Sequence, residues 1–571
     1  MARQIRSKLS KNILKKFSIG RYFSKPLIFL KAIWNVLYRI QPLFSIIIAL
    51  IISLPIAYSI VQGIDNVEFK NAEKIYKEGV IGNLTGIDPL PQLPLEKPFS
   101  QLNRDVTHLL FDPLFSTDTS GNPVGILAES YEAQSGGSKF NIKLKDRKWS
   151  DGTKITSADV VETFSSIQNS GVSGLYYSST EGVKIEAVDD LNFSFTLDVP
   201  NSAFLETLYW PVLPAKNLVV RYDVLMKTDF AKNPISSTDW EIFSITDKDI
   251  TLKNHSNRKL KFVFFDTQGE LEKALNSGVI DGYSTLEKIA EKNYTTVSKF
   301  VLPRQLYAIY FNLTDTGSPI IKDPIIRKAI SYSIDRNGIS QDVGVPRQSI
   351  IIQSSWAFNP NANTYPIDIQ KANDILDQAG YAKDGDYRKA NGVEIAFTIS
   401  IPDVSIRKKQ AEYIQEYLKK VGIRMNIKAI SDTQIIDNER KFNLFYNSVV
   451  LTKNYEAMIY SVDSGLDPDK FSQWHSTKIP DYNKGTYGLN FSGYSSVRVD
   501  NYLTQGRKQT DQNARKTPYN QFQKVFYEDA PVIALYNPYL FYVTSKKISN
   551  VNFTSAFRIE NRFVNFNEWK F

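Results

Sequence analysis

The chain has 571 residues, which is enough for three or four domains of about 150 residues each. Hydrophobic residues make up 42% and charged residues 23%, which excludes a disordered, collagen-like or polytopic membrane protein as a description of the whole chain. There are no cysteines and only three separated histidines, so disulfides, cysteine nucleophiles and local metal-binding motifs are excluded, and we expect no metal and no cofactor.

The net charge of +9 comes from the N-terminal end of the chain. Residues 1–42 contain ten cations, and the first acidic residue is Asp65. Removing those ten from +9 leaves the other residues near −1, so the body has no bulk attraction to nucleic acid. The ten cations are Arg3, Arg6, Lys8, Lys11, Lys15, Lys16, Arg21, Lys25, Lys31 and Arg39.

A membrane segment follows the basic stretch. From Leu43 to Val61 the chain has nineteen residues without a charge, just enough for a helix to cross about 30 Å of hydrocarbon. By the positive-inside rule we expect a cytoplasmic segment at 1–42, a single transmembrane helix at 43–62, a stalk at 63–78 and an extracytoplasmic body in the cell membrane. The alternative is a cleaved signal peptide that ends near Ser59.

Beyond the stalk, short strands alternate with helices. Residues 140–144 and 191–197 alternate apolar and polar side chains, which predicts half-buried strands. Thr156, followed three residues later by Asp159, has the spacing of a capping box and predicts a helix start. Residues 259–265, KLKFVFF, predict a buried strand that leads into a helix ending at 276.

Three further amphipathic helices are predicted in the second half of the chain. They cover residues 323–334, 369–379 and 404–420, and the last two end before Gly380 and Gly422. Strands that alternate with helices in this way indicate an α/β fold.

Four segments carry recognisable patterns. Residues 109–131 form an apolar strand, a turn and the element PVGILAESY, residues 149–160 read WSDGTKITSADV, residues 310–336 contain KDPIIRKAISYSIDR, and residues 528–536 read EDAPVIALY. In content and order they resemble the extracellular solute-binding proteins of the dipeptide- and oligopeptide-binding type (family 5), the receptors of ABC importers. The resemblance extends from about residue 79 to the end of the chain.

These patterns also have purely structural explanations. Gly152 and Asp151 suit a turn that buries Trp149 and touches no ligand. Solvated or capping charges explain Arg327 and Arg336 as well as a ligand carboxylate would. The patterns therefore indicate the fold, and function depends on a different segment.

Residues 458–471, MIYSVDSGLDPDKF, are that segment. By the resemblance, Asp463 takes the place of the aspartate that pairs with a peptide's α-ammonium in relatives, and a carboxylate in a cleft could bind such a group through charge-assisted hydrogen bonds. A polar turn is the alternative reading. Leu466 is one residue more than the family pattern has between its glycine and the following Asp-Pro.

Aromatic residues near this segment are candidates for the cleft wall. Tyr460, Trp474 and Trp356 fall in stretches that form cleft walls in the family, although aromatics at regular spacing are more often core. Residues 234–240 replace the glycine-rich crossing between lobes that relatives carry.

The resemblance implies an α/β, two-lobed fold of the periplasmic-binding-protein type with an inserted subdomain. We expect lobe I at 79–105, 216–259 and 511–571, the inserted subdomain at 106–215, and lobe II at 260–510. Several crossings between lobes would form a hinge, and the lobes would close over a bound ligand.

The resemblance also implies a function. The chain would be a membrane-anchored receptor that captures oligopeptides, or a similar small polar solute, in the cleft and delivers them to the membrane subunits of an ABC importer. Metalloprotease, serine-hydrolase, dinucleotide-binding and P-loop motifs are missing from the sequence, so we do not expect an enzyme. The alternative is a membrane-tethered sensor or scaffold that keeps this fold without a role in uptake.

Overall fold

The structure is a computed structural model, and it leaves the expected membrane helix at 43–62 outside its described residues. Within the part of the chain that is described, no helix has both the length and the apolar character needed to cross a bilayer. Strand β1 begins at Ile75, and Tyr76 and Glu78 on it are fully buried, so residues 75–78 belong to a sheet and not to the expected stalk. The described residues are 34, 75–90, 100–118, 121–169, 176–362, 364–432, 438–481, 484, 486, 488–553 and 558–571.

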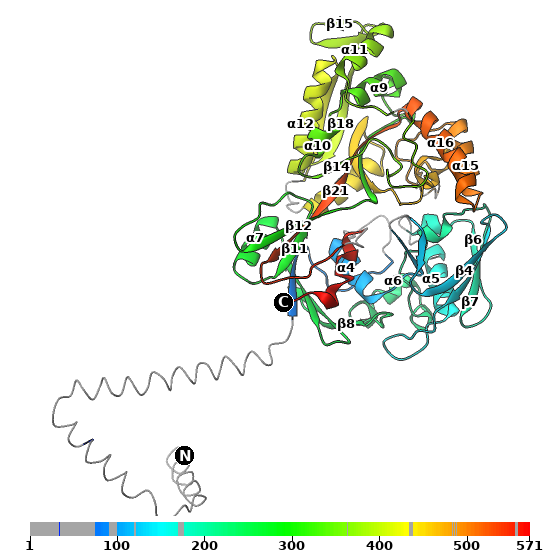
Figure 1. The fold of residues 1–571 in the computed structure, drawn as a ribbon, viewed down its shortest axis with the longest axis vertical. Coiled ribbons are helices and arrows are strands. Elements are labelled where there is room, and N and C mark those ends of the chain that lie inside the picture. Colours follow the sequence, from blue (N-terminus) through cyan, green and yellow to red (C-terminus); the bar gives the residue numbers. More distant parts are fainter. Residues whose placement is uncertain are drawn as a thin grey trace, which may run out of the picture. The chain divides into compact units, whose positions relative to one another are not determined.

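One mixed sheet of 12 strands runs through the body, and a single long strand joins its two halves (Figure 1). The order is β19-β18-β20-β13-β21-β11-β1-β10-β9-β8, with β12 and β14 also paired to β21. The 14 residues of β21 (Val532–Ser545) pair with β13 up to Tyr536 and with β12 from Tyr539 onward. We call the strands on the β13 side, with their helices, lobe II, and those on the β1 side lobe I.

Lobe II is a sheet covered by helices on both faces. Along β13 (Gln305–Phe311), Tyr307 and Ile309 pack into one core cluster, whereas Ala308 and Tyr310 pack into another. This alternation explains why β13 is apolar throughout its centre. The other strands are β14 (Gly344–Pro346), β18 (Ala396–Pro402), β19 (Arg424–Ile430) and β20 (Ala457–Asp463).

Different helices cover each face of the lobe II sheet. The Ile309 side carries α8 (Pro319–Lys322), α9 (Pro324–Ser333), α10 (Arg336–Ser340), α11 (Ile369–Gln378) and α12 (Ser405–Lys420). The Tyr310 side carries α13 (Asn438–Phe445), the π-helical turn Tyr446–Val450, α14 (Phe471–Trp474), α15 (Val497–Arg507) and α16 (Gln512–Asp529). A hairpin outside the main sheet is formed by β15 (Lys383–Asp384), β16 (Tyr387–Ala390) and β17 (Val393–Glu394).

Lobe I shares one hydrophobic core with the inserted subdomain, in which Tyr76, Phe140 and Trp569 belong to the same cluster. Its strands are β1 (Ile75–Ile81), β8 (Trp240–Ile245), β9 (Asp249–Asn254), β10 (Lys259–Phe265), β11 (Gly282–Thr285) and β12 (Thr295–Val301). Its helices are α4 (Gln101–Leu110), α7 (Gln268–Asn276) and the 3-10 helices η8 (Ile559–Phe563) and η9 (Phe566–Glu568).

The inserted subdomain is built on a separate four-stranded sheet of order β4-β5-β7-β6. Its strands are β4 (Ala128–Gln134), β5 (Lys139–Leu144), β6 (Val183–Ala187) and β7 (Asn192–Leu197), with the short pair β2 (Phe115–Thr117) and β3 (Pro123–Gly125) beside them. Helix α5 (Ser157–Asn169) and the 3-10 helices η1 (Tyr177–Ser179), η2 (Phe204–Thr207) and η3 (Ala215–Asn217) complete this region. Helix α6 (Tyr222–Leu225) and the 3-10 helix η4 (Asp229–Ala231) follow it and form hydrogen bonds with residues 87–90, beyond β1.

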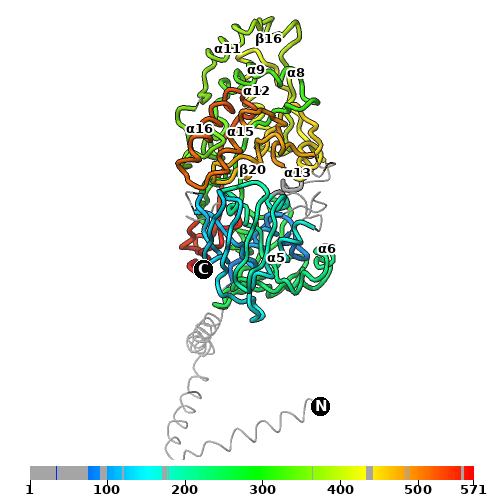
Figure 2. Tube along the Cα trace, turned by 90° about the vertical axis from the view of Figure 1, so that its right-hand side faces the viewer, coloured from blue at the N-terminus to red at the C-terminus, as the bar shows by residue number. Residues whose placement is uncertain are grey.

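The strand pairing moves the boundaries expected for lobe II at 260–510. Strands β10 and β11 pair with β1, so residues 259–285 lie in lobe I. Helix α16 packs in the lobe II core, so that lobe continues past residue 510. A short buried strand carries no local sign of its partner, which is why the sequence misplaced it. Figure 2 shows the result, with α9, α12 and α16 in the upper half and α5 and α6 in the lower half.

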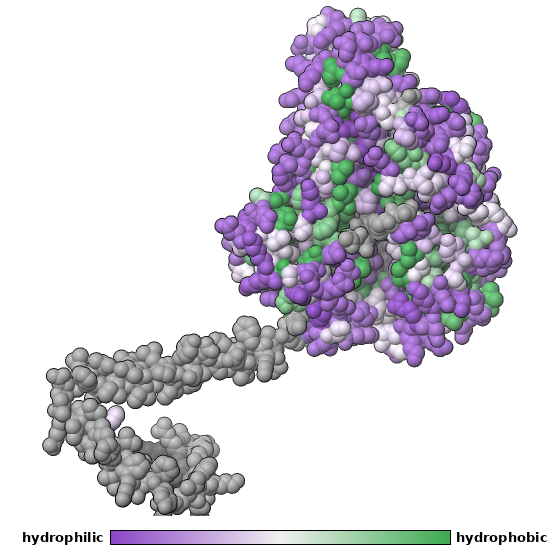
Figure 3. Space-filling model, in the orientation of Figure 1, coloured by the Kyte–Doolittle hydropathy of each residue, from purple (hydrophilic) through white to green (hydrophobic). Residues whose placement is uncertain are grey.

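Most locally predicted elements are confirmed. Strands β5, β7 and β10 and helices α7, α9, α11 and α12 match their expected ranges within one or two residues. At the start of α5, the Asp159 carboxylate accepts a hydrogen bond of 2.7 Å from the backbone N–H of Thr156, which is half of the predicted capping box. The face of the body in Figure 3 is mostly hydrophilic, with scattered hydrophobic residues, as is normal where the large apolar groups are buried.

Candidate functional site

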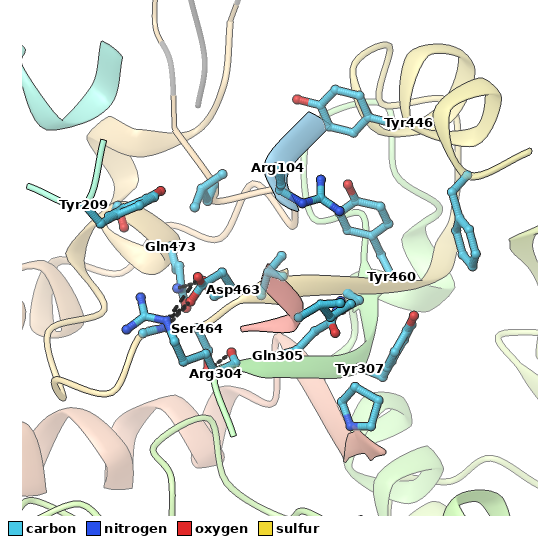
Figure 4. Close-up of a pocket in the computed structure, with 18 of the residues that line it drawn as sticks. Arg104, Tyr209, Arg304, Gln305, Tyr307, Tyr446, Tyr460, Asp463, Ser464 and Gln473 are labelled. Atoms are coloured by element: carbon cyan, nitrogen blue, oxygen red, sulfur yellow. Dashed lines mark hydrogen bonds and ion pairs between the residues drawn. The ribbon is translucent and has the colours of Figure 1, made fainter. Parts of the chain in front are cut away.

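A cavity of about 1020 Å³ lies between lobe II on one side and lobe I with the inserted subdomain on the other. This volume is at the upper end of the usual range for small-molecule pockets. Its wall includes Tyr307 of β13, Tyr460 and Asp463 of β20, Arg407 of α12 and Glu206 of η2. The close-up in Figure 4 shows how the side chains around Asp463 converge.

Asp463 is the last residue of β20, opposite Gln305 on β13, and its carboxylate is held by two arginines. Arg304 donates from Nε to both carboxylate oxygens at 3.0 and 3.1 Å, and the Nη2 of Arg558 is 3.1 Å from Oδ2. The N–H of Gly465 adds a hydrogen bond of 2.9 Å. Burial alone would raise the pKa of Asp463, but the charges of Arg304 and Arg558 outweigh it and hold the pKa well below its usual range.

Asp463 is therefore not the open carboxylate that the sequence led us to expect. Each of its oxygens already accepts hydrogen bonds, although 44% of the side chain remains exposed. An incoming ammonium would have to compete with the guanidinium groups or add to them. Its role in ligand binding stays a prediction.

Glu206 joins the inserted subdomain to lobe II across the cavity. Its carboxylate accepts hydrogen bonds from Arg304 Nη1 at 2.8 Å, from the N–H of Leu466 at 2.8 Å and from the N–H of Asp467 at 3.3 Å. Leu466, the extra residue relative to the family pattern, thus contacts the opposite side of the cleft. It has not moved Asp463 out of the cavity wall.

Tyr460 lies three residues before Asp463 and also lines the cavity. Its ring stacks on that of Tyr446 at 6.3 Å with an interplanar angle of 18°, and meets Phe491 edge-on at 5.7 Å. The rings of Tyr460 and Tyr446 face the same part of the cavity in Figure 4. They form an aromatic wall suited to the apolar parts of a ligand.

Trp474 and Trp356 do not line the cavity, contrary to the expectation. Trp474 is 2% exposed in the lobe II core, where its ring stacks on Tyr310 at 6.0 Å. Trp356 packs against the same core, with the guanidinium of Arg515 5.1 Å from its ring centroid. All three aromatic residues pack against the same lobe II core cluster, so proximity in sequence to a motif did not reveal which ring would also reach the cavity wall.

The structural reading of the family patterns is supported. Trp149 is buried and donates from its indole N–H to Asp159, while Gly152 adopts a φ of +86° in the adjoining turn. Arg327 and Arg336 are not solvated and do not line the cavity; both are buried and donate to several backbone carbonyls. Burial lowers the pKa of each to about 10.

The chain was compared with known protein families. Residues 122–483, more than half of the chain, match the bacterial extracellular solute-binding proteins, family 5 (middle region). The chain belongs to this family. The resemblance carried by the four sequence patterns is thereby confirmed.

Curated members of family 5 are distant relatives of this chain. The oligopeptide-binding protein AppA of Bacillus subtilis is 24% identical over 471 residues, which cover 76% of this chain and 82% of the relative. The glutathione-binding protein GsiB of Pectobacterium atrosepticum is 24% identical over 480 residues, covering 78% of this chain and 87% of the relative.

Solved structures show the same two-lobed fold. NikZ from Campylobacter jejuni, in complex with Ni(L-His), has a TM-score of 0.69 and 21% identity, and the match covers 88% of this chain and 100% of NikZ. AppA from Bacillus subtilis, in complex with a nonapeptide, has a TM-score of 0.66 and 22% identity, covering 87% and 98%. The expected periplasmic-binding-protein-like fold is confirmed.

Sequence reasoning missed the charged residues that surround Asp463. Arg304 and Glu206 are 98 positions apart and Arg304 and Asp463 are 159 apart, so no local spacing could have joined them. Arg558 is close to the C-terminus and carries no motif. Among the described residues, no group of three or more His, Cys, Asp or Glu side chains could hold a metal ion.

Proposed function

We propose that this member of family 5 captures short peptides, or similar small polar solutes with an amino group, in the interlobe cleft. It would deliver them to the membrane subunits of an ABC importer while tethered to the membrane by Leu43 to Val61. The observation that carries the proposal is the cavity of about 1020 Å³ with the carboxylate of Asp463 on its wall. Relatives named for binding oligopeptides and glutathione support the same class of ligand.

The cleft offers two kinds of contact to such a ligand. Asp463 and Glu206 supply negative charge, and Arg304 orients both carboxylates. The rings of Tyr460 and Tyr446 supply apolar surface. A peptide held through its backbone and ends would tolerate varied side chains.

The most direct test is to identify what the protein carries. The full chain, purified in detergent from cells, is unfolded, and the released small molecules are identified by mass spectrometry. We expect peptides or other compounds with a free amine. Recovery solely of compounds without an amine would contradict this assignment.

A mutation tests the amine contact itself. Asp463→Asn keeps the shape of the side chain and removes its charge, so a free-amine peptide should bind about 10- to 150-fold more weakly, the scale of 1.5–3 kcal/mol for a charge-assisted hydrogen bond. N-acetylation of the peptide should reproduce most of that loss, and the two changes together should be far from additive. Equal binding of acetylated and free peptides by the parent would remove Asp463 from the site.

A further inference from the structure

The loop of residues 464–470, between β20 and α14, reaches across the cleft to Glu206. The N–H groups of Leu466 and Asp467 donate to the two oxygens of the Glu206 carboxylate, at 2.8 and 3.3 Å. Gly465 adopts a φ of +63°, and a Cβ added to it would lie 3.3 Å from either of these oxygens. Successive backbone N–H groups beside a residue in the left-handed region form a concave site for an anion. The anion here is a side chain of the inserted subdomain, so the loop is the lobe II half of a contact across the cleft.

Lys470, at the end of this loop, is a buried lysine that donates to the loop itself. Only 1% of the residue is exposed. Its Nζ donates to the carbonyl oxygen of Asp467 at 2.7 Å and to that of Ser464. Burial lowers the pKa of Lys470 to about 8, which leaves the amine mainly protonated at pH 7, so both hydrogen bonds are charge-assisted. Two carbonyls of the loop are thus directed to Lys470, and two N–H groups to Glu206.

The acidic side chains of the loop have partners of their own in lobe II. Arg515 donates to both oxygens of the Asp467 carboxylate at 2.9 and 2.5 Å, and Arg507 donates to Asp469 at 2.6 Å. These contacts hold side chains, whereas Lys470 holds the main chain on either side of the N–H groups that meet Glu206. A buried ammonium is costly unless its hydrogen bonds are made. Lys470 makes them with the main chain, so the direction of the two N–H groups depends on it.

We propose that Lys470 is a positioning residue for closure of the cleft: it keeps residues 464–470 in the shape that receives Glu206. The inference rests on the proposed function, because the contact would retain a ligand between the lobes. Leu466, the residue that this loop has beyond the family pattern, donates the shorter of the two hydrogen bonds to Glu206. Without the ammonium, the inserted subdomain should separate from lobe II more often.

The test measures how often the contact opens in the full chain in detergent. Because the chain has no cysteine, Ser202→Cys introduces a single thiol. The N–H of Ser202 donates to the carbonyl of Arg507 in lobe II at 2.8 Å, and its Oγ is buried without a hydrogen-bond partner among the described residues. A thiol at this place reacts with an uncharged maleimide while the inserted subdomain is away from lobe II. Its labelling rate is therefore proportional to the share of separated molecules.

The variants form a double-mutant cycle between Lys470 and Glu206. Lys470→Met removes the ammonium and should raise the labelling rate about 10-fold or more, the lower end of the effect of one charge-assisted hydrogen bond. Glu206→Ala removes the acceptor and should raise the rate as well. In the Glu206→Ala background, Lys470→Met should add less than about 3-fold, because both changes break the same contact. Lys470→Gln keeps an uncharged donor, should give a smaller rise, and replaces Lys470→Met in the cycle should that variant fold poorly. Lys516→Met is the control: it removes an exposed lysine of lobe II outside the cavity wall and should label at the parental rate.

A second thiol separates closure from unfolding. Val499 is fully buried in the lobe II core, so the thiol of Val499→Cys reacts when lobe II itself opens. Its labelling rate in the Lys470 variants should stay within about 3-fold of the parental rate. Equal acceleration of both thiols would show that Lys470 merely stabilises lobe II, and would overturn the inference. A parental rate at Ser202→Cys in both Lys470 variants, or a Lys470→Met effect that adds in full to that of Glu206→Ala, would overturn it too.

The outcomes also separate this inference from the proposed function, because the thiol rates are measured without a ligand. A parent that releases no peptide on unfolding would remove the proposed function, and the thiol rates would still decide the role of Lys470. Peptides recovered from the parent, together with parental thiol rates in the Lys470 variants, would leave the proposed function in place and overturn the inference.

Discussion

Replacement of Glu206 by glutamine should weaken the contact between the inserted subdomain and lobe II. The Glu206 side chain is 14% exposed and accepts three hydrogen bonds from lobe II or from the connection between lobes, donated by Arg304, Leu466 and Asp467. Gln keeps one oxygen and turns the other acceptor into an NH₂ group that faces an N–H donor. It also removes one of the two negative charges that compensate Arg304.

The expected size of the effect follows from these contacts. The variant loses one charge-assisted hydrogen bond and places two N–H donors face to face without an acceptor. Together these changes should destabilise the state in which the inserted subdomain contacts lobe II by about 2–4 kcal/mol. The ratio of separated to contacting lobes should then rise about 30- to 700-fold, since each 1.4 kcal/mol is a factor of about ten. Ligand affinity should fall because the binding-competent state is less populated.

Glu181→Gln is a matched control in the same subdomain. Glu181 also contacts lobe II, through Lys478 at 2.6 Å, but 46% of its side chain is exposed. An exposed ion pair of this kind contributes about 0–1 kcal/mol. The two variants make the same chemical change across the same cleft and differ in burial and in number of donors.

The absence of cysteine makes the assay simple, because introduced cysteines are the only labelling sites. Val188 in the inserted subdomain and Val497 in lobe II are 73% and 77% exposed, so both accept spin labels without loss of core packing. Pulsed electron resonance should give a longer or broader distance distribution for Glu206→Gln and a parental one for Glu181→Gln. Superimposable distributions for the parent and Glu206→Gln would refute the role of Glu206.

Three more outcomes are expected. Arg304 and Arg558 hold the pKa of Asp463 below its value in the unfolded chain, so on acidification the carboxylate is protonated in the unfolded chain first. The stability that Asp463 contributes is therefore present above about pH 5 and is lost as the pH falls below about 4. The thermal midpoint of Asp463→Asn should therefore lie below that of the parent at pH 6.5, with a smaller difference at pH 3.5, and a difference independent of pH would contradict the ion pairs. Trp149→Ala should lower the free energy of unfolding by about 3–5 kcal/mol and leave peptide affinity unchanged; a selective loss of affinity would make Trp149 part of the site. Protease added to intact cells should remove the body and leave a membrane fragment that ends near residue 64, whereas a released protein that begins near residue 60 would favour a cleaved signal peptide.

Local sequence patterns predicted local structure well. The alternation in β5, the near-capping box at Thr156 and the glycine after α11 each depend on residues a few positions apart. Their physical causes act within one turn or one strand, so one sequence is enough to recognise them. Asp463 was placed on the cavity wall for a different reason, because it sits in a segment that resembles the family.

Longer-range features were not readable in the same way. Trp474 and Tyr460 are both aromatic and near the same motif, yet one packs in the core and the other lines the cavity. The pairing of β10 with β1 and the contact of Glu206 with Leu466 join segments more than a hundred residues apart. No interaction between residues close in sequence favours these partners over others. The contacts are therefore set by the assembled fold alone.

Charge balance in the cleft limits what the carboxylate of Asp463 adds to the binding of an amine. Arg304, Arg558, Asp463 and Glu206 form a cluster of two positive and two negative charges, so an added ammonium creates an excess unless a guanidinium moves away. The net result of binding the ammonium is the exchange of one cation for another on the carboxylate of Asp463. The loss of affinity on Asp463→Asn should therefore lie nearer to about 10-fold than to about 150-fold, the two ends of the range expected for a charge-assisted hydrogen bond.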